Sequence, residues 1–453
     1  MKKPNILLIT FDDIGAVLGC YGDPHARTPH LDTLAREGVL FHRGYTTHPS
    51  CSPSRSSILT GLYPHQNGQI GLARPIYRVK EEIPLLPNVL RASGYRTGIL
   101  GKLHVAPDEA FEFEFNHKSM DPPTPLDAMR RDSAAYAKFA RQFMEQDDER
   151  PFFLYLNFID PHRDFVDQVK GLPEKPRGAE EVATLPFLAM DTPELRREAA
   201  GYQNCIERVD AGVGMVMEAL RASGYEDDTL VFVVADHGPP FTRAKTTCYE
   251  AGLRVTMMAR WPGRVEAGVD AQELVSVVDI MPTVLEAAGI PAPPEQAGRS
   301  LWPLFKGERT TWRETVCGEY TAHTPQTYFP RRSIRDDRYK LIINLLQDRP
   351  NPVGSVDGCG AWAEVQKAEY DGTPVRAIYD RYDRPPPVEL YDLQEDPNEF
   401  VDLADDPAYQ EIRDRLSRAL REWQEETNDP LQDPAELDAL TRWHDALPEN
   451  QRR

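Results

Sequence analysis

The chain has 453 residues, of which 40% are hydrophobic, and carries 72 acidic against 52 basic side chains for a net charge of -20. This length allows one large domain and a smaller one, with a substantial core. The acidic balance argues against a nucleic-acid partner and weakens any binding along long polyanionic chains. The apolar runs are strand-length, so we expect no membrane partner.

The first ten residues are basic and then apolar, which resembles a signal peptide only superficially. The apolar part is too short, no small-residue cleavage site follows it, and Asp12 and Asp13 come directly afterwards. We interpret the segment as the first core strand and expect a cytoplasmic protein. The 6 cysteines show neither a CxxC pair nor a disulfide-like spacing: Cys20, Cys51, Cys205, Cys248, Cys317 and Cys359.

Four apolar segments, residues 5–10, 95–100, 152–158 and 229–235, are predicted strands that each end in polar residues. Helices are predicted between them, the longest starting at Thr192 and closed by Gly224. This alternation predicts an α/β fold with a mostly parallel sheet covered on both faces. Ligands bind beyond the carboxyl ends of such strands. The polar residues expected to converge there are Asp12, Asp13, Lys102, His104, Asp160, His162, Arg163, Asp236 and His237.

Between the first two predicted strands lies Cys51-Ser52-Pro53-Ser54-Arg55, a rare spacing of cysteine, proline and arginine. A helix is predicted over residues 54–62, with Ser52 as its cap and Pro53 in its first turn. A side chain at this point faces unpaired backbone N–H groups, which favour an anion. On the motif alone, a buried structural cysteine fits as well as a functional one.

Three carboxylates, Asp12, Asp13 and Asp236, predict a site for a hard divalent cation such as calcium or magnesium, which His237 completes less naturally. Positive charge and hydrogen-bond donors are expected around it. A metal ion surrounded by cations suits transfer of a tetrahedral oxyanion, so sulfate and phosphate esters both fit. The cations and donors are Arg55, Lys102, His104, His162 and Lys245, of which either His104 or His162 can protonate a leaving group.

A plain thiol is a poor nucleophile toward such esters, which hints that Cys51 is modified. The whole pattern resembles the type I sulfatase family of the alkaline-phosphatase-like superfamily. Its signature matches residues 51–55 and 59–61, and the resemblance extends to residues 28–32, 389–393 and 396–399. It implies an alkaline-phosphatase-like α/β fold: a large mixed, mostly parallel sheet flanked by helices, with a smaller C-terminal α+β subdomain.

The resemblance further implies that a maturation enzyme oxidises Cys51 to Cα-formylglycine, whose hydrate attacks sulfur, forms a covalent sulfate intermediate and is then regenerated. Calcium would be held by Asp12, Asp13, Asp236, His237 and the modified Cys51. Many relatives have Asn where this chain has His237, so magnesium or manganese stays open. The remaining implied roles are orientation of the diol by Arg55, sulfate binding by Lys102 and Lys245, leaving-group protonation by His162 and assistance in deprotonation of the diol by His104.

Within the family, residues 51–71, 101–105, 151–155, 160–163 and 423–430 resemble the heparan N-sulfatase (N-sulfoglucosamine sulfohydrolase) group. This implies hydrolysis of a sulfate or sulfamate on a small glycan-derived saccharide, with N-sulfoglucosamine as the first expectation. Lysosomal members have Arg at the position of Lys245, which is a departure in the sulfate contact. Candidate sugar contacts are Asp160, Arg163 and His323, although His323 fits a surface loop equally well.

Three alternatives stay open at this point. The first is an O-sulfatase acting on sugar, aryl or choline-type sulfate esters, and the second is a phosphonate or phosphate ester hydrolase on the same scaffold. The third is a non-catalytic glycan-binding protein in which Cys51 is unmodified.

The catalytic domain is predicted at residues 1–300 and a C-terminal subdomain at 301–453, because residues 291–294 are a turn-rich exit. Strands at 315–319, 333–334, 339–344 and 388–391 predict a small antiparallel sheet, on which a helix over 406–426 would pack. Residues 371–387, rich in proline and arginine, are predicted to be a long surface loop.

Overall fold

Seven strands form the main sheet of the described chain, in the spatial order β4-β5-β1-β6-β7-β2-β8. The computed structural model describes residues 3–120, 124–308, 310–352 and 360–448. Strands β4, β5, β1 and β6 run parallel, whereas β7 is antiparallel to both β6 and β2. The predicted mixed, mostly parallel sheet is confirmed. The bounds are β1 (Asn5–Phe11), β2 (Val39–Phe41), β4 (Arg96–Gly101), β5 (Phe152–Phe158), β6 (Thr229–Ala235), β7 (Met257–Arg260) and β8 (Val269–Ala271), beside a pair formed by β3 (Gly44–Tyr45) and β9 (Val275–Ser276).

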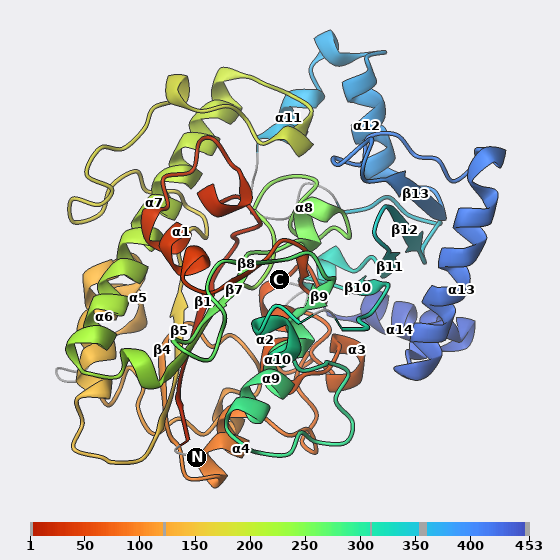
Figure 1. The fold of residues 1–453 in the computed structure, drawn as a ribbon. Helices are drawn as coiled ribbons and strands as arrows, with labels where there is room; N and C mark the ends of the chain where they lie inside the picture. The colour runs from red at the N-terminus through yellow and green to blue at the C-terminus, as the bar shows by residue number, and fades with distance from the viewer. Residues whose placement is uncertain (1–2, 121–123, 309, 353–359, 449–453) are drawn as a thin grey trace.

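The central strands are apolar because helices cover both faces of the sheet. Every residue of β1, β5 and β6 is buried, as expected for parallel strands between two helical layers. In Figure 1 the helices α1, α5, α6 and α7 lie on one side of β1, β4 and β5, and α2, α9 and α10 lie on the other. The bounds are α1 (Pro29–Arg36), α2 (Cys51–Thr60), α3 (Pro64–Asn67), α4 (Leu86–Ala92), α5 (Leu126–Met129), α6 (Ser133–Met144), α7 (Pro193–Ala222), α8 (Glu250–Leu253), α9 (Ile280–Ala287) and α10 (Trp302–Phe305).

Helix α2 begins earlier than the sequence predicted. Cys51 is its first residue and Ser50, not Ser52, occupies the N-cap position, while Gly61 ends the helix in the left-handed region with φ 67°. All ten residues of α2 are buried. The helix therefore brings Cys51 into the interior at its N-terminal end, where unpaired N–H groups point outward along the axis.

The second half of the chain adds an antiparallel sheet of four strands in the order β10-β11-β12-β13. Helix α13 packs on this sheet with Leu416 and Leu420 buried, so the predicted sheet and helix are confirmed. The division of the chain at residue 300 stays a prediction. The bounds are β10 (Val316–Tyr320), β11 (Arg331–Arg335), β12 (Tyr339–Asn344), β13 (Val388–Asp392), α11 (Ala361–Val365), α12 (Pro374–Asp383), α13 (Gln410–Glu426) and α14 (Pro434–Ala446).

The prediction of a long loop over residues 371–387 is wrong, because α12 lies within it. The side chain of Thr373 accepts a hydrogen bond from the backbone N–H of Arg376 at 3.2 Å, and proline stands in the first turn. Ile378, Tyr379 and Tyr382 form a buried face. The cap and this apolar spacing outweigh the composition of the segment.

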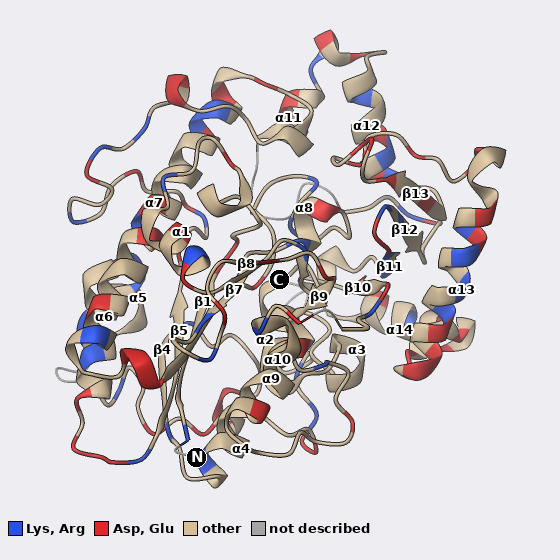
Figure 2. Ribbon diagram, in the orientation of Figure 1, with Lys and Arg blue, Asp and Glu red and all other residues tan. Residues whose placement is uncertain are grey.

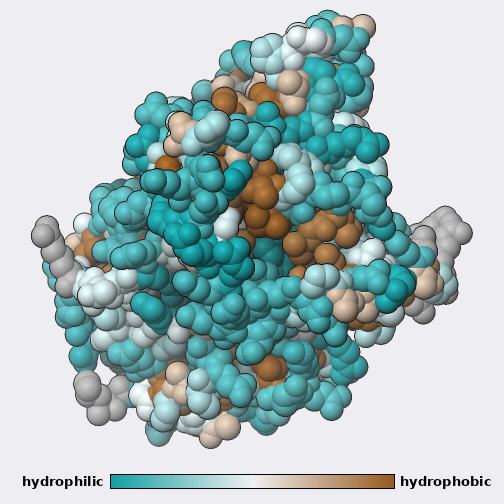
Figure 3. Space-filling model, turned by 90° about the vertical axis from the view of Figure 1, so that its right-hand side faces the viewer, coloured by the Kyte–Doolittle hydropathy of each residue, from teal (hydrophilic) through white to brown (hydrophobic). Residues whose placement is uncertain are grey.

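Charged residues of both signs are interspersed over the described chain (Figure 2). The face in Figure 3 is mostly hydrophilic, with apolar side chains gathered around its centre. No helix of the described residues is long and apolar enough to cross a membrane.

Asp210 on α7 ties this helix to the start of α1. Its carboxylate accepts hydrogen bonds from the backbone N–H groups of Leu31 at 2.8 Å and His30 at 3.3 Å. Burial raises the pKa of Asp210 to about 7. An aspartate ionises near 4 in the unfolded chain, so the stability that Asp210 contributes is present below pH 4 and is lost as the pH rises through 7.

We therefore expect Asp210→Asn to be more stable than the wild type at pH 8 by about 1–3 kcal/mol, because it keeps an acceptor oxygen without the buried charge. Urea unfolding at pH 4, 6 and 8 measures the difference, which should vanish or reverse at pH 4. A stability difference that is the same at all three pH values would contradict this prediction.

Candidate active site

Polar residues beyond adjacent parallel strands lie together at one edge of the main sheet. Lys102, beyond β4, places Nζ 2.5 Å from Oδ2 of Asp12, which follows β1. Lys245, in the loop beyond β6, places Nζ 2.9 Å from Oδ1 of Asp13. The expected convergence of these strand ends is thus present in the folded chain.

A group of buried side chains at this point has the geometry to hold a metal ion. One ligand atom from each of Asp12, Cys51, Asp236 and His237 lies within 4.8 Å of the others. Sγ of Cys51 is 3.4 Å from Oδ1 of Asp12 and 3.3 Å from Nε2 of His237. Asp13 places Oδ1 3.1 Å from that same histidine nitrogen. The structure therefore brings all five predicted metal ligands together.

Hydrogen bonds orient the two ligands that follow β6. Nδ1 of His237 lies 2.9 Å from the carbonyl oxygen of Gly238, which can only accept, so Nδ1 carries the proton and Nε2 presents its lone pair to the cluster. Oδ1 of Asp236 accepts from the backbone N–H groups of Asp13 at 3.1 Å and His237 at 2.9 Å. Fixed carboxylates suit a hard divalent cation, and the imidazole nitrogen of His237 is a further ligand of a softer kind.

Arg55, one turn into α2, is fully buried and joins three of the strand ends. Its Nε donates to Oδ2 of Asp236 at 2.9 Å, and its Nη1 donates to Oδ1 of Asn157 at 2.7 Å and to the carbonyl oxygen of Lys102 at 3.0 Å. Its Nη2 has no hydrogen-bond partner among the described residues and lies 3.9 Å from Oδ2 of Asp12. A buried guanidinium with an open donor suits an anion at this point.

The electrostatics of the cluster keep Asp12 ionised and Cys51 protonated. Burial would raise the pKa of Asp12, but the charges of Lys102 and His162 hold it well below its usual value. Burial, and then the charge of Asp12, raises the pKa of the Cys51 thiol well above its usual value. Because the thiolate is the reactive form of cysteine, the unmodified side chain is a weak nucleophile here.

Two histidines flank the cluster with different properties. Burial, and then the charge of Lys102, lowers the pKa of His104 to about 2, which keeps its ring neutral and able to accept a hydrogen bond. Nδ1 of His162 lies 2.8 Å from the carbonyl oxygen of Arg163, so Nδ1 donates and Nε2 is left to face a ligand. His162 is half-buried, as a group that meets a substrate must be.

The three candidate sugar contacts have different surroundings. Asp160 is 3% exposed, and its two oxygens accept from Arg131 at 3.2 Å and from Arg208 at 2.7 Å. Both carboxylate oxygens are thus engaged with arginines, and the role of Asp160 as a sugar contact stays a prediction. Arg163 forms an ion pair with Glu198, with Nη2 of the arginine 2.6 Å from Oε2 of the glutamate.

His323, which the sequence placed equally well on a surface loop, lies at the N-terminal end of α2. Its Nδ1 is 2.7 Å from Oγ of Ser50, the residue before Cys51. The loop after β10 thus reaches the site from the second sheet.

Sequence reasoning missed Asn157, whose side-chain oxygen accepts a hydrogen bond from Arg55. It is the only amide in the apolar segment 152–158, and this exception within a buried strand was a usable signal. Ser50 was missed as the residue that pairs with His323, because the two are far apart in the chain.

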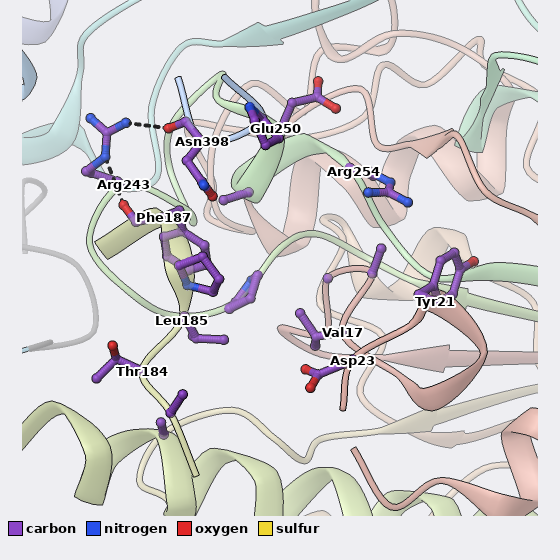
Figure 4. A pocket seen from close by; sticks show the side chains of 18 of the residues that line it. Val17, Tyr21, Asp23, Thr184, Leu185, Phe187, Arg243, Glu250, Arg254 and Asn398 are labelled. Carbon is purple, nitrogen blue, oxygen red and sulfur yellow. Dashed lines mark hydrogen bonds between the residues drawn. The ribbon is translucent and has the colours of Figure 1, made fainter. Parts of the chain in front are cut away.

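A cavity of about 460 Å³ is lined by residues from several parts of the chain (Figure 4). Arg243 stands at its edge and donates to the carbonyl oxygens of Phe187 at 3.1 Å and Asn398 at 2.9 Å. Gly15 and Pro239 line it, each two residues beyond a predicted metal ligand, but none of the predicted site residues is among its described lining residues.

The mixed sheet, with a cluster of carboxylate, histidine and cysteine side chains at one edge, has the predicted alkaline-phosphatase-like fold. A family model described as "Sulfatase" matches residues 4–290, and one described as "N-sulphoglucosamine sulphohydrolase, C-terminal" matches residues 242–349. The chain therefore belongs to the sulfatase family, the hydrolases of sulfate esters.

Individual relatives agree with this assignment. N-sulphoglucosamine sulphohydrolase of Homo sapiens is 32% identical over 462 residues, covering 95% of this chain and 91% of the relative. An ulvan-active sulfatase of Formosa agariphila is 30% identical over 442 residues, covering 95% and 82%. A solved structure in complex with its substrate D-glucosamine-2-N,6-O-disulfate shares the fold, with a TM-score of 0.70, 19% identity, and 94% and 99% of the two chains covered.

The predicted cytoplasmic location is wrong, because the sulfatases that match this chain are lysosomal or secreted proteins. That prediction depended on the short apolar segment near residue 10. The same residues are β1, so their composition reflects the core of the sheet and does not decide a location.

Proposed function

We propose that the protein removes a sulfate or sulfamate group from a small glycan-derived saccharide, with N-sulfoglucosamine as its first substrate. The observation that carries the proposal is the buried contact of Cys51 with Asp12 and His237, at the point where Arg55, Lys102 and Lys245 supply positive charge. The relative named N-sulphoglucosamine sulphohydrolase, matched over 95% of this chain, supports the choice of substrate.

In this proposal a maturation enzyme converts Cys51 to formylglycine, which when hydrated supplies the attacking hydroxyl. An oxygen at the position of Sγ is a better calcium ligand than a thiol sulfur, because calcium is a hard cation that prefers oxygen ligands. Asp12, Asp13, Asp236 and His237 would hold the cation, which when bound polarises the sulfate oxygens and neutralises the carboxylates. Calcium is the first expectation, with magnesium or manganese open.

The cations of the chain would bind the sulfate group. Arg55 has an open donor at Nη2. The ammonium groups of Lys102 and Lys245 pair with Asp12 and Asp13, and Asp12 in turn contacts Sγ of Cys51. Charge-assisted donors in a buried site stabilise the oxygens on which charge develops during sulfate transfer.

Proton transfers would be divided between the two histidines. The neutral ring of His104 would assist deprotonation of the diol by accepting a hydrogen bond from it, and His162 would protonate the leaving nitrogen or oxygen through Nε2. Protonation matters most for an amine or an alkoxide, which leaves poorly as an anion. His323 is a candidate sugar contact because it lies beside Ser50 at the entrance to α2.

The test is sulfate release from glucosamine N-sulfate, with glucosamine 6-sulfate and a phosphate ester measured alongside. The protein is co-expressed with a formylglycine-generating enzyme. We expect turnover of the N-sulfate at least about tenfold above the 6-sulfate, because a site that recognises the sulfated amine loses contacts with the other isomer.

Release from the 6-sulfate alone, with the aldehyde present, would replace the sulfamate assignment by an O-sulfatase. Release of phosphate alone would indicate a phosphate ester hydrolase on the same scaffold. A chain that remains unmodified at Cys51 after co-expression and releases neither group would restore the non-catalytic, glycan-binding alternative.

A further inference from the structure

We propose that Arg163 is a positioning residue that holds the catalytic His162 in place, and not a sugar contact. The inference rests on the proposed role of His162 as the general acid. It concerns five residues, Arg163, Phe165, Glu198, Tyr202 and Phe241, which we call the Arg163 clamp.

The guanidinium group of Arg163 is occupied by partners from three parts of the chain. Its Nη2 donates to Oε2 of Glu198 on α7 at 2.6 Å, and its Nε donates to the carbonyl oxygen of Pro240 at 3.2 Å. It also lies 4.6 Å from the ring centroid of Phe165 and 5.2 Å from that of Phe241. Only 16% of the side chain is exposed. These contacts leave it little capacity to bind a sugar.

The same residue orients the histidine through its main chain. The carbonyl oxygen of Arg163 accepts the hydrogen bond from Nδ1 of His162 at 2.8 Å, and it also accepts one from Nη2 of Arg130 at 3.1 Å. A shift of Arg163 therefore moves the acceptor that fixes the ring of His162. Because Nε2 is the atom that would meet the leaving group, its position depends on this acceptor.

The Arg163 clamp also contacts the main chain of Asp13, one of the predicted metal ligands. The rings of Phe165, Tyr202 and Phe241 contact one another at centroid distances of 5.3 to 5.7 Å. Tyr202 is fully buried, and its hydroxyl donates to the carbonyl oxygen of Asp13 at 2.8 Å. Glu198 and Tyr202 are four residues apart on α7, so one face of this helix supports both ends of the site.

Loss of this support should affect substrates unequally. A general acid accelerates the departure of a basic leaving group, whereas 4-nitrophenolate leaves without protonation. A displaced His162 should thus slow the cleavage of a sugar sulfate or sulfamate much more than the cleavage of 4-nitrophenyl sulfate. A structural defect that merely lowers the fraction of folded enzyme would reduce both to the same extent.

The experiment measures kcat and KM of the matured, full-length enzyme for both substrates. Arg163→Lys keeps the charge but loses the planar contacts with the rings and with Pro240, and Glu198→Gln weakens the ion pair. We expect either change to lower kcat for the sugar substrate about 10- to 100-fold, with KM little changed and 4-nitrophenyl sulfate hydrolysis within about threefold of the wild type. Glu194→Gln is the matched control, since Glu194 pairs with Arg197 on the exposed start of the same helix.

His162→Ala, measured in the same assay, separates the two levels of inference. If His162→Ala lowers both activities equally, His162 is not the general acid and the proposed function fails at that step. If His162→Ala shows the leaving-group dependence but Arg163→Lys does not, the positioning role of Arg163 is overturned. A rise in KM for the sugar alone would instead make Arg163 a substrate contact.

Discussion

Replacing Cys51 by alanine is expected to lower sulfate release by about 10⁴-fold or more, because it removes the atom from which the nucleophile is made. Sγ lies between Asp12 and His237, and no serine or threonine hydroxyl within the described part of the chain hydrogen-bonds to these two side chains. The remaining cations and the metal site would still bind a sulfated sugar. Activity should therefore fall in kcat with little change in substrate binding, which kinetics and calorimetric titration measure separately.

Cys317→Ala provides the matched control. Cys317 is also a buried, free cysteine, but it belongs to the core between the second sheet and α13. It should lose some stability and keep its turnover per folded molecule. The peptide mass at residue 51 decides whether the aldehyde is present, and a wild type that turns over substrate with an unmodified thiol would contradict the proposed nucleophile.

The strand ends were predictable from the sequence because parallel strands covered on both faces must be apolar throughout. A carboxylate or histidine directly after such a run can lie only at the edge of the sheet. This reasoning located Asp12, Lys102, His162 and Asp236 without any knowledge of their contacts. It could not show which of these side chains turn toward a ligand, and Asp160, which follows the same rule, is turned toward Arg208.

Long-range contacts account for what the sequence did not reveal. His323 and Ser50 meet because the loop after β10 reaches the start of α2, and no local pattern connects two residues so far apart. The Arg163 clamp likewise depends on where α7 lies across the sheet. By contrast, the start of α2 was misplaced by a local ambiguity, because Ser50 and Ser52 are both suitable caps.

Removal of the metal ion is expected to abolish sulfate release, since the charges of Asp12, Asp13 and Asp236 then have only the cations of the chain to balance them. Burial raises the pKa of Asp236, and the charge of the neighbouring Asp12 adds to this, so a bound cation would relieve an unfavourable carboxylate. Dialysis against a chelator should lower activity at least about 100-fold and lower the thermal unfolding temperature. At a metal concentration 100 times Kd the cation adds about 2.7 kcal/mol of stability.

Asp12→Asn tests the same site without a chelator. Asp12 lies against both Sγ of Cys51 and Nζ of Lys102, so loss of its charge should reduce bound metal, measured by elemental analysis, and lower turnover about 100-fold. Asp210→Asn is the matched control: it replaces a buried acid that is hydrogen-bonded to the start of α1, and the variant should keep its metal. Re-addition of calcium, magnesium or manganese to the dialysed enzyme identifies the ion by the recovery of both stability and turnover. Undiminished turnover of metal-free protein would show that these carboxylates serve the fold alone.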